Sequence, residues 1–420
     1  MTEREAEALI RQRAWAGQKP GLDRIRRLLE RLGDPQKKLK FVHIAGSNGK
    51  GSTAAMLSSV LTAAGLKTGL YTSPHLWSIR ERFQVNGVPI PETAFGALTQ
   101  RVLEAAEDET EFELMTAIGM VWFLEAGCDI VVLETGLGGR LDSTNVIDSP
   151  EAAVITRIGL EHTEILGDTL DKIAAEKAGI IKEGCGVVLY SQGREVTEVI
   201  ERACRRAGGQ LFVTAPQALE VISSTPEGQQ FRYRGTGPFR ISLLGEYQLY
   251  NAITVLETVD ALQRRGWDIP LEAVLRGLDR ARWPGRMELA WYSPNVILDG
   301  GHNPQCMEAL AQSLRKLYPG KKLIFLTGVL ADKDYPAMME KLLPLAKEFY
   351  TITPDSPRAM PAGELADYLE KQGIQATPCK TVWDGLDQAL AASGPQDVIC
   401  ACGSLYLIGE VRHILEGCAG

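Results

Sequence analysis

The apolar positions in the first part of the chain fall into short runs separated by longer amphipathic stretches. Residues 40–45 are apolar and partly β-branched, which is typical of a buried parallel strand, and residues 52–64 have helical spacing that stops at Gly65. A second short strand is predicted at residues 67–71. A strand, a helix and a strand at this spacing predict a βαβ unit, whose ligand edge lies at the carboxyl ends of its strands.

The same alternation predicts most of the other elements before residue 283. Two helical patterns lie within residues 4–32, and a turn at Asn86-Gly87 indicates a hairpin over residues 80–91. Alternating aromatic and polar residues within 218–245 predict antiparallel strands on the margin of the sheet. Further strands are predicted at 129–133 and 153–158, and two more strand–helix alternations run to about residue 214. Helices are predicted at 92–107, 113–127, 168–178, 248–265 and 271–280.

A second series of elements begins after Trp283-Pro-Gly-Arg, where proline and glycine break the helical pattern. Strands are predicted near 295–299, 322–328, 348–353 and 397–402, with helices between them. The whole pattern predicts an α/β fold in two domains. Residues 1–288 would form a mostly parallel sheet with a phosphate loop and N-terminal helices, and residues 289–420 a smaller Rossmann-like α/β domain.

Composition narrows the class of protein. With 45% hydrophobic and 23% charged residues the chain is typical of a globular protein, and its formal charge of −8 without a basic stripe argues against nucleic acid as a partner. The eight cysteines show neither zinc-site nor disulfide spacing, which favours reduced thiols and a cytoplasmic location. The charged start lacks the apolar core of a signal peptide, and no apolar run suggests a membrane span.

The glycine-rich turn at residues 46–51, between the predicted strand and helix, is a candidate phosphate site. Its glycines let backbone N–H groups point into one concavity, Lys50 can bridge the β- and γ-phosphates, and Ser52 or Thr53 offers a hydroxyl for magnesium. The turn departs from the common phosphate-loop pattern, because Ile44 stands where the first glycine is expected and Gly51 separates the lysine from the serine. The alternative is a glycine-rich turn with a solvated lysine.

Three further polar residues follow predicted strands of the same sheet. Ser73, Glu134 and His162 all fall at the carboxyl edge that carries the glycine-rich turn. A carboxylate there suits magnesium, and glycines at 136, 138 and 139 favour close approach of a ligand. Taken singly, the serine could be a turn residue, the glutamate a helix cap and the histidine a hydrogen-bonded loop residue. In the second domain, Asp299 ends the first strand, where a carboxylate could hold ribose hydroxyls.

Nine motifs in one order resemble the folylpolyglutamate synthase family and, more broadly, the Mur ligase superfamily. They are Gly-Ser-Asn-Gly-Lys-Gly-Ser, Ser-Pro-His-Leu, Arg-Phe-Gln-Val-Asn-Gly, Glu-Thr-Gly-Leu-Gly-Gly-Arg-Leu-Asp-Ser-Thr-Asn, Glu-His-Thr-x3-Gly, Glu-Lys-Ala-Gly-Ile, Pro-Gly-Arg-Met-Glu, Asp-Gly-Gly-His-Asn-Pro and Gly-Ser-Leu-Tyr. The resemblance extends from about Leu22 to Arg412. Single motifs would carry little weight, whereas the ordered set is specific.

The resemblance implies an ATP-dependent ligase that joins L-glutamate to a folate-type carboxylate, either dihydropteroate or tetrahydrofolate. It implies ATP binding by Asn48, Gly49, Lys50, Gly51, Ser52, Asn251, Arg286 and Asp299. It implies two Mg²⁺ ions held by Ser73, Glu134, His162 and Lys177, with catalytic roles for Lys50, Lys177 and His162. The folate or pteroate site would include Leu22, Asp23, Arg24, Phe112, Glu113, Leu141 and Asp142, and the glutamate site His302 and Ser404.

The resemblance also implies that carbon dioxide carbamylates Lys177. This reaction turns a cation into an oxygen ligand and requires a neutral amine, hence surroundings that disfavour the ammonium form. By itself Glu176-Lys177 would be a solvated helix end. Two positions depart from the family pattern: Glu161 replaces an aspartate, and Tyr247 replaces a histidine before Gln248.

Several alternatives stay open at this point. Phe112-Glu113 and Leu141-Asp142 fit a dihydropteroate site, so we expect a bifunctional enzyme that makes dihydrofolate and also extends glutamate tails; a monofunctional synthase is the alternative. Cell-wall Mur ligases carry a further domain ahead of the phosphate loop, for which about 40 residues leave no room. A nucleotide-dependent switch is the rival class, but the chain has no guanine-reading Asn-Lys-x-Asp motif. We expect a monomer.

Overall fold

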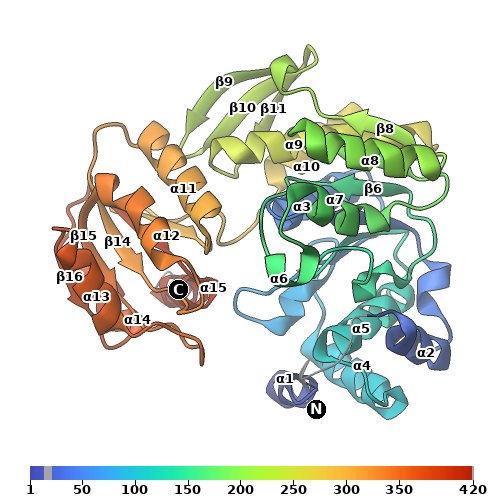
Figure 1. Cartoon of the computed structure of the whole chain (residues 1–420), viewed down its shortest axis with the longest axis horizontal. Helices are drawn as coiled ribbons and strands as arrows, with labels where there is room; N and C mark the ends of the chain where they lie inside the picture. Colours follow the sequence, from blue (N-terminus) through green and yellow to red (C-terminus); the bar gives the residue numbers. More distant parts are fainter. Residues whose placement is uncertain (14–20, 419–420) are drawn as a thin grey trace. The chain divides into compact units, whose positions relative to one another are not determined.

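A computed structural model describes residues 1–13 and 21–418 and has an α/β fold (Figure 1). The chain divides into two compact units. The first comprises Met1–Val221, Gln230–Ile241 and Gln248–Ala281, and the second Ile222–Gln229, Ser242–Tyr247 and Arg282–Gly420. The domain boundary expected at residue 288 stays a prediction.

The first unit is built around an eight-stranded sheet in the order β4-β3-β2-β5-β1-β6-β7-β8. Its strands are β1 (Phe41–Ala45), β2 (Thr68–Tyr71), β3 (Phe83–Val85), β4 (Val88–Pro89), β5 (Ile130–Glu134), β6 (Ala152–Ile155), β7 (Gly186–Leu189) and β8 (Gln210–Val213). The six strands from β2 to β8 are parallel, and the β3–β4 hairpin adds an antiparallel edge. Because β1 lies between β5 and β6, the loops that follow these three strands share one edge.

Helices of the first unit are α1 (Glu3–Arg11), α2 (Asp23–Arg31), α3 (Lys50–Ala63), α4 (Glu92–Ala105), α5 (Glu111–Glu125), α6 (Thr163–Leu166), α7 (Leu170–Lys177), α8 (Arg194–Arg206), α9 (Glu246–Arg264) and α10 (Leu271–Arg280). Apolar side chains of α1, α2, α4 and α5 form one core with Phe41, Tyr71 and Leu133 of the sheet. A second core joins α7 and α8 to β6 and β7. Helix α10 crosses α3 closely, since a Cβ on Gly277 would lie 2.3 Å from the Cα of Val60.

Residues 219–241 form a separate three-stranded sheet in the order β11-β10-β9. Its strands are β9 (Leu219–Thr225), β10 (Gly228–Tyr233) and β11 (Thr236–Ile241). The expectation that they extend the margin of the main sheet was wrong. Alternation of polar and apolar residues predicts strands but does not say which sheet they join, because that choice depends on packing between distant segments.

The second unit contains a six-stranded sheet in the order β12-β13-β17-β14-β15-β16, in which only β12 is antiparallel to its neighbour. Its strands are β12 (Glu288–Trp291), β13 (Asn295–Asp299), β14 (Leu323–Thr327), β15 (Ala346–Thr351), β16 (Ala376–Pro378) and β17 (Val398–Cys402). Its helices are α11 (Pro304–Leu317), α12 (Tyr335–Leu342), α13 (Ala362–Lys371), α14 (Val382–Ala391) and α15 (Leu405–Cys418). The predicted α/β class is therefore confirmed.

Short 3-10 turns η1 (Pro35–Lys38), η2 (Ile79–Arg82), η3 (Ser143–Val146), η4 (Ala178–Ile180), η5 (Pro216–Ala218) and η6 (Leu343–Leu345) complete the described elements. Sequence patterns missed β12 and β16, which are short edge strands. They also missed α6, a single turn. Within residues 1–13 and 21–418, no helix combines the length and apolarity that a membrane span requires.

Candidate active site

The turn after β1 is fixed from both sides. Backbone N–H groups of Ser47 and Asn48 donate to the carbonyl of Arg157 beyond β6, at 2.9 and 3.1 Å. Gly49 begins α3 with φ = +86°, and a Cβ there would lie 2.5 Å from Oδ1 of Asn251. A Cβ on Gly46 would lie 1.8 Å from Oγ1 of Thr156. Glycine is therefore required at both positions, and the turn is preformed.

Two lysines converge on one backbone oxygen in this turn. Nζ of Lys50 and Nζ of Lys177 donate to the carbonyl of Gly46, at 3.0 and 2.8 Å. Lys177 is only 3% exposed, so it is not a solvated helix end. Burial, assisted by the charge of Lys50, lowers the pKa of Lys177 to about 7, against the opposing effects of Glu161 and Asp142. The turn thus gathers positive charge, which favours an anionic ligand.

Ser73 and Glu134 lie together at the same edge. Glu134 ends β5, is 3% exposed, and accepts a hydrogen bond from the backbone N–H of Ser73 at 3.1 Å. A serine hydroxyl and a carboxylate are oxygen donors of the type that magnesium prefers, so this pair fits such an ion.

His162 occupies a different setting from this pair. It is exposed, has φ = 50°, and precedes α6. Among the described residues, no group of three or more His, Cys, Asp or Glu side chains is gathered so that it could hold a metal ion. The predicted set contains only two such residues, and its remaining members are a serine and a lysine.

Ser52 and Asn251 are linked through Gln248, to which the sequence motifs gave no functional role. Gln248 on α9 donates from Nε2 to Oγ of Ser52 at 3.1 Å and accepts at Oε1 from Nδ2 of Asn251 at 2.9 Å. All three side chains are buried. Their link holds the start of α3 against α9. The sequence feature that could have identified Gln248 is its i, i+3 spacing from Asn251, which places both residues on one face of the helix.

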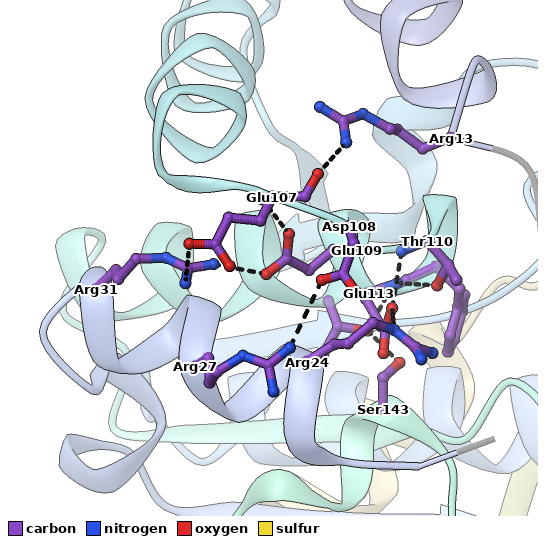
Figure 2. Close-up of polar contacts among 12 residues, drawn as sticks. Arg13, Arg24, Arg27, Arg31, Glu107, Asp108, Glu109, Thr110, Glu113 and Ser143 are labelled. Atoms are coloured by element: carbon purple, nitrogen blue, oxygen red, sulfur yellow. Dashed lines mark hydrogen bonds and ion pairs between the residues drawn. The ribbon is translucent and has the colours of Figure 1, made fainter. Parts of the chain in front are cut away.

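Two of the predicted pteroate residues, Arg24 on α2 and Glu113 on α5, contact each other (Figure 2). Nε of Arg24 lies 3.1 Å from Oε2 of Glu113, which also accepts from the N–H of Thr110 at 2.7 Å. The Phe112 ring covers Gly136, where a Cβ would lie 2.4 Å from Cζ. Leu22, which caps α2, is buried, whereas Asp23 is exposed.

Asp142 organises the loop that follows β5. Oδ1 accepts from the N–H and Oγ1 of Thr144, at 3.0 and 2.5 Å, and Oδ2 accepts from the N–H of Leu137 at 2.7 Å. Burial raises the pKa of this carboxyl, and these hydrogen bonds oppose the shift. The neighbouring Leu141 is 37% exposed. The structure therefore places Asp142 inside the loop and Leu141 on its surface.

Asp299 is the most highly connected of the predicted residues in the second unit. It ends β13, and its carboxylate accepts from the N–H groups of Met287 and Gly301 at 3.0 and 2.8 Å and from the hydroxyl of Tyr247 at 3.4 Å. Burial raises the pKa of Asp299, and Arg286 opposes this shift. Tyr247, the departure from the family pattern, thus faces a predicted ATP-binding residue.

The two predicted glutamate-site residues follow different strands of this unit. Nδ1 of His302 lies 3.0 Å from the carbonyl of Gly300. Ser404 is 2% exposed, and its Oγ accepts from the N–H of Tyr406 at 3.2 Å. The ligand roles of all these residues, in both units, stay predictions.

Comparison with known families gives two matches along the chain. Residues 44–259 match the Mur ligase middle domain, and residues 285–405 match the Mur ligase glutamate ligase domain. The first match contains the glycine-rich turn, Glu134 and Lys177, and the second contains Asp299 and Ser404.

Individual relatives match over nearly the full length. The dihydrofolate synthase/folylpolyglutamate synthase of Bacillus subtilis is 36% identical over 98% of this chain and 99% of its own. A solved structure described as E. coli FolC in complex with DHPP and ADP has a TM-score of 0.88 at 29% identity and covers 100% of this chain and 99% of its own. The bifunctional folylpolyglutamate synthase/dihydrofolate synthase from Yersinia pestis, complexed with AMPPNP and Mn ion, has a TM-score of 0.86 at 29% identity, covering 99% and 98%.

Proposed function

Because this chain belongs to the Mur ligase family, among its folylpolyglutamate and dihydrofolate synthases, we propose that it joins L-glutamate to a folate-type carboxylate at the expense of ATP. The expectation of an ATP-dependent ligase is confirmed by these matches. The observation that carries the proposed chemistry is the pair of lysines on the carbonyl of Gly46 in a preformed glycine-rich turn.

The proposed reaction has two steps. An oxygen of the acceptor carboxylate attacks the γ-phosphorus of ATP, which forms an acyl phosphate and releases ADP. The amino nitrogen of glutamate then attacks the acyl carbon, forms the amide and expels phosphate, and the nitrogen loses a proton. Lys50 and the N–H groups of the turn offset the negative charge that develops on the phosphate oxygens in the first step. The second step needs a dry site, because water would hydrolyse the acyl phosphate.

A divalent metal accompanies ATP in this proposal, and the Yersinia pestis relative bound to AMPPNP and Mn ion supports it. We assign Ser73 and Glu134 as ligands from their proximity, and His162 and Lys177 as ligands from the family resemblance. Two Mg²⁺ ions are expected, and when bound they would screen the negative charge of the phosphates. From the family resemblance, Asn251, Arg286 and Asp299 are further proposed ATP-binding residues.

Carbamylation of Lys177 forms a finer part of the proposal. The unprotonated Nζ would attack the carbon of CO₂, forming a C–N bond and releasing one proton. A pKa of about 7 leaves about half of the amines unprotonated at neutral pH, far more than for an ordinary lysine. NMR of the protein in isotope-labelled bicarbonate should reveal a carbamate carbon that is missing from Lys177→Arg. A spectrum identical for the two proteins would refute the modification.

The acceptor is tested by measuring ADP release with glutamate and either dihydropteroate or tetrahydrofolate monoglutamate. A bifunctional enzyme releases ADP with both acceptors, and a monofunctional one with a single acceptor. ADP release that ignores both acceptor and glutamate would instead identify a nucleotide switch and refute the ligase proposal. Pteroate contacts by Leu22, Asp23, Arg24, Phe112, Glu113, Leu141 and Asp142 and glutamate contacts by His302 and Ser404 belong to this proposal. The monomeric state and cytoplasmic location stay predictions.

A further inference from the structure

The segment between α4 and α5 prepares the start of α5, where the proposed pteroate residues lie. It consists of residues 106–110 and contains the acidic run Glu107-Asp108-Glu109. Thr110 caps α5, and its N–H and side chain exchange hydrogen bonds with Glu113 in a capping box. Any shift of this segment therefore moves Thr110, Phe112 and Glu113 together.

Helix α2 presents a stripe of arginines to this segment. Arg24, Arg27 and Arg31 recur at i, i+3 and i+7, so they share one face of the helix. Figure 2 shows all three pointing toward the acidic residues. Arg27 lies 3.6 Å from Asp108, but both side chains are at least half exposed, so this pair contributes little. The other two arginines contact buried carboxylates, those of Glu113 and Glu109.

One guanidinium group, that of Arg31, contacts two residues of the segment and the last residue of α4. Nε donates to the carbonyl of Ala105 at 2.6 Å, Nη1 lies 3.2 Å from Glu107, and Nη2 lies 2.7 Å from Oε1 of Glu109. The Glu109 side chain is fully buried, and its Oε2 accepts from the N–H of Glu107 at 2.6 Å. The planar fork thus connects the last residue of α4 to the carboxylate that shapes the approach to α5.

Arg13 holds the same segment from a second side. Its Nη1 donates to the carbonyl of Glu107 at 2.6 Å, and its own carbonyl accepts from the N–H of Glu111 at 2.8 Å. Both arginines precede residue 44, where the match to the Mur ligase middle domain begins. The arginine clamp, defined as Arg13 and Arg31 with Glu107 and Glu109, therefore lies partly outside the domain that these ligases share.

We infer that Arg31, assisted by Arg13, is a positioning residue for the acceptor subsite. The clamp fixes residues 105–111 and thereby sets where Thr110, Phe112 and Glu113 lie. It therefore affects acceptor binding without contacting the glycine-rich turn at residues 46–51. This inference rests on the proposed folate-glutamate ligase function. It also implies that acceptor selection depends on residues that lie ahead of the common ligase domain.

The test compares Arg31→Met with Arg101→Met. Arg101 on α4 and Glu125 on α5 form an ion pair at 2.7 Å, the same distance as between Arg31 and Glu109, but both are exposed, so this pair is the matched control. Arg31→Met should raise KM for the acceptor by about tenfold or more, because a misplaced binding group loses productive contacts. KM for ATP should stay within about twofold, since the turn at 46–51 is untouched. Arg101→Met should change neither constant.

Two further variants separate positioning from general loosening. Arg31→Lys keeps the charge but cannot span three acceptors, so its acceptor KM should fall between those of wild type and Arg31→Met. Arg13→Met removes a contact near the surface and covers the case in which Arg31→Met does not fold. The inference is overturned if folded variants keep the wild-type acceptor KM, or if KM for ATP rises in parallel. Absence of acceptor-dependent ADP release in the wild type would instead refute the proposed function itself.

Discussion

The glycine-rich turn at residues 46–51 and the arginine clamp differ in how their charged groups are paired. In the turn, Lys50 and Lys177 share one carbonyl, and the charge of Lys50 adds to the burial that lowers the pKa of Lys177. In the clamp, the buried carboxylate of Glu109 has a guanidinium at 2.7 Å and a backbone N–H at 2.6 Å. The two lysines of the turn thus favour binding of an anion, whereas the carboxylate of the clamp is already paired with a cation from the protein.

This difference separates binding of the reacting groups from placement of the scaffold. Two cations held close together repel each other and lower the stability of the unliganded protein. A bound phosphate removes this repulsion, which strengthens nucleotide binding. A paired and buried carboxylate gives no such gain but fixes geometry, because removal of either partner leaves an uncompensated polar group. Removing the buried charged group, Lys177 in the turn or Glu109 in the clamp, should therefore have opposite effects on stability.

The largest expected effect is on turnover, at Lys50. Lys50→Ala should lower glutamate-dependent ADP release by about a thousandfold or more, because one preorganised cation at the transferring phosphoryl group is lost. Thermal unfolding should change little, since Gly46 keeps its bond from Lys177. Lys67→Ala, at an exposed lysine ahead of β2, is the control and should keep wild-type turnover. Turnover of Lys50→Ala close to that of wild type would contradict the role of the turn.

A smaller effect, on stability, is expected in the clamp. Glu109→Gln should lower the free energy of unfolding by about 2–3 kcal/mol, because an amide has one oxygen and must turn its NH₂ toward either Arg31 or the N–H of Glu107. Urea unfolding measures this change. Glu125→Gln makes the same substitution in an exposed pair and should change stability by less than about 0.5 kcal/mol. Equal losses in the two variants would show that burial of Glu109 is irrelevant.

These two regions also differ in how far the sequence could predict them. Lys50, Ser73 and Glu134 follow apolar runs whose parallel order places them on one edge, so strand position alone brought them together. The clamp was not predicted. Arg31 and Glu109 lie 78 residues apart in the sequence, and Arg13 and Glu107 lie 94 apart. Arg31 also belongs to an i, i+3, i+7 series of arginines, which is normally a solvated helix face, so only packing of α2 against α5 reveals its pairing.

Burial was the other quantity that the sequence left open. Glu176-Lys177 has the composition of a solvated helix end, yet Lys177 is buried because α7 ends beneath the glycine-rich turn. Antiparallel strands within 218–245 were expected from alternation, but the separate three-stranded sheet that they form was not. In each case local pattern predicted the element, and contacts between distant segments decided its surroundings.

The smallest and most diagnostic effect concerns Lys177 in protein free of nucleotide and CO₂. Lys177→Met should raise the free energy of unfolding at pH 7 by about 1 kcal/mol, since a buried amine is replaced by an apolar chain of similar length and Gly46 keeps Lys50 as a donor. In the folded protein the pKa of Lys177 is about 7, lowered from an ordinary value of 10.5. Between these values the unfolded chain binds more protons, so wild-type stability rises with pH across this window.

The stability advantage of Lys177→Met over wild type should therefore fall as the pH increases from 7 to 10.5 and reverse in sign within this window, because each pKa unit is worth about 1.4 kcal/mol. Below pH 7 both states of the wild type carry the proton, and the difference should level off. Lys172→Met, at an exposed lysine on the same helix, should show no comparable trend. A difference that stays constant through the window would mean that Lys177 keeps its proton in the folded protein. The turn would then hold two full positive charges, its contrast with the clamp would be greater than described, and the amine could not react with CO₂.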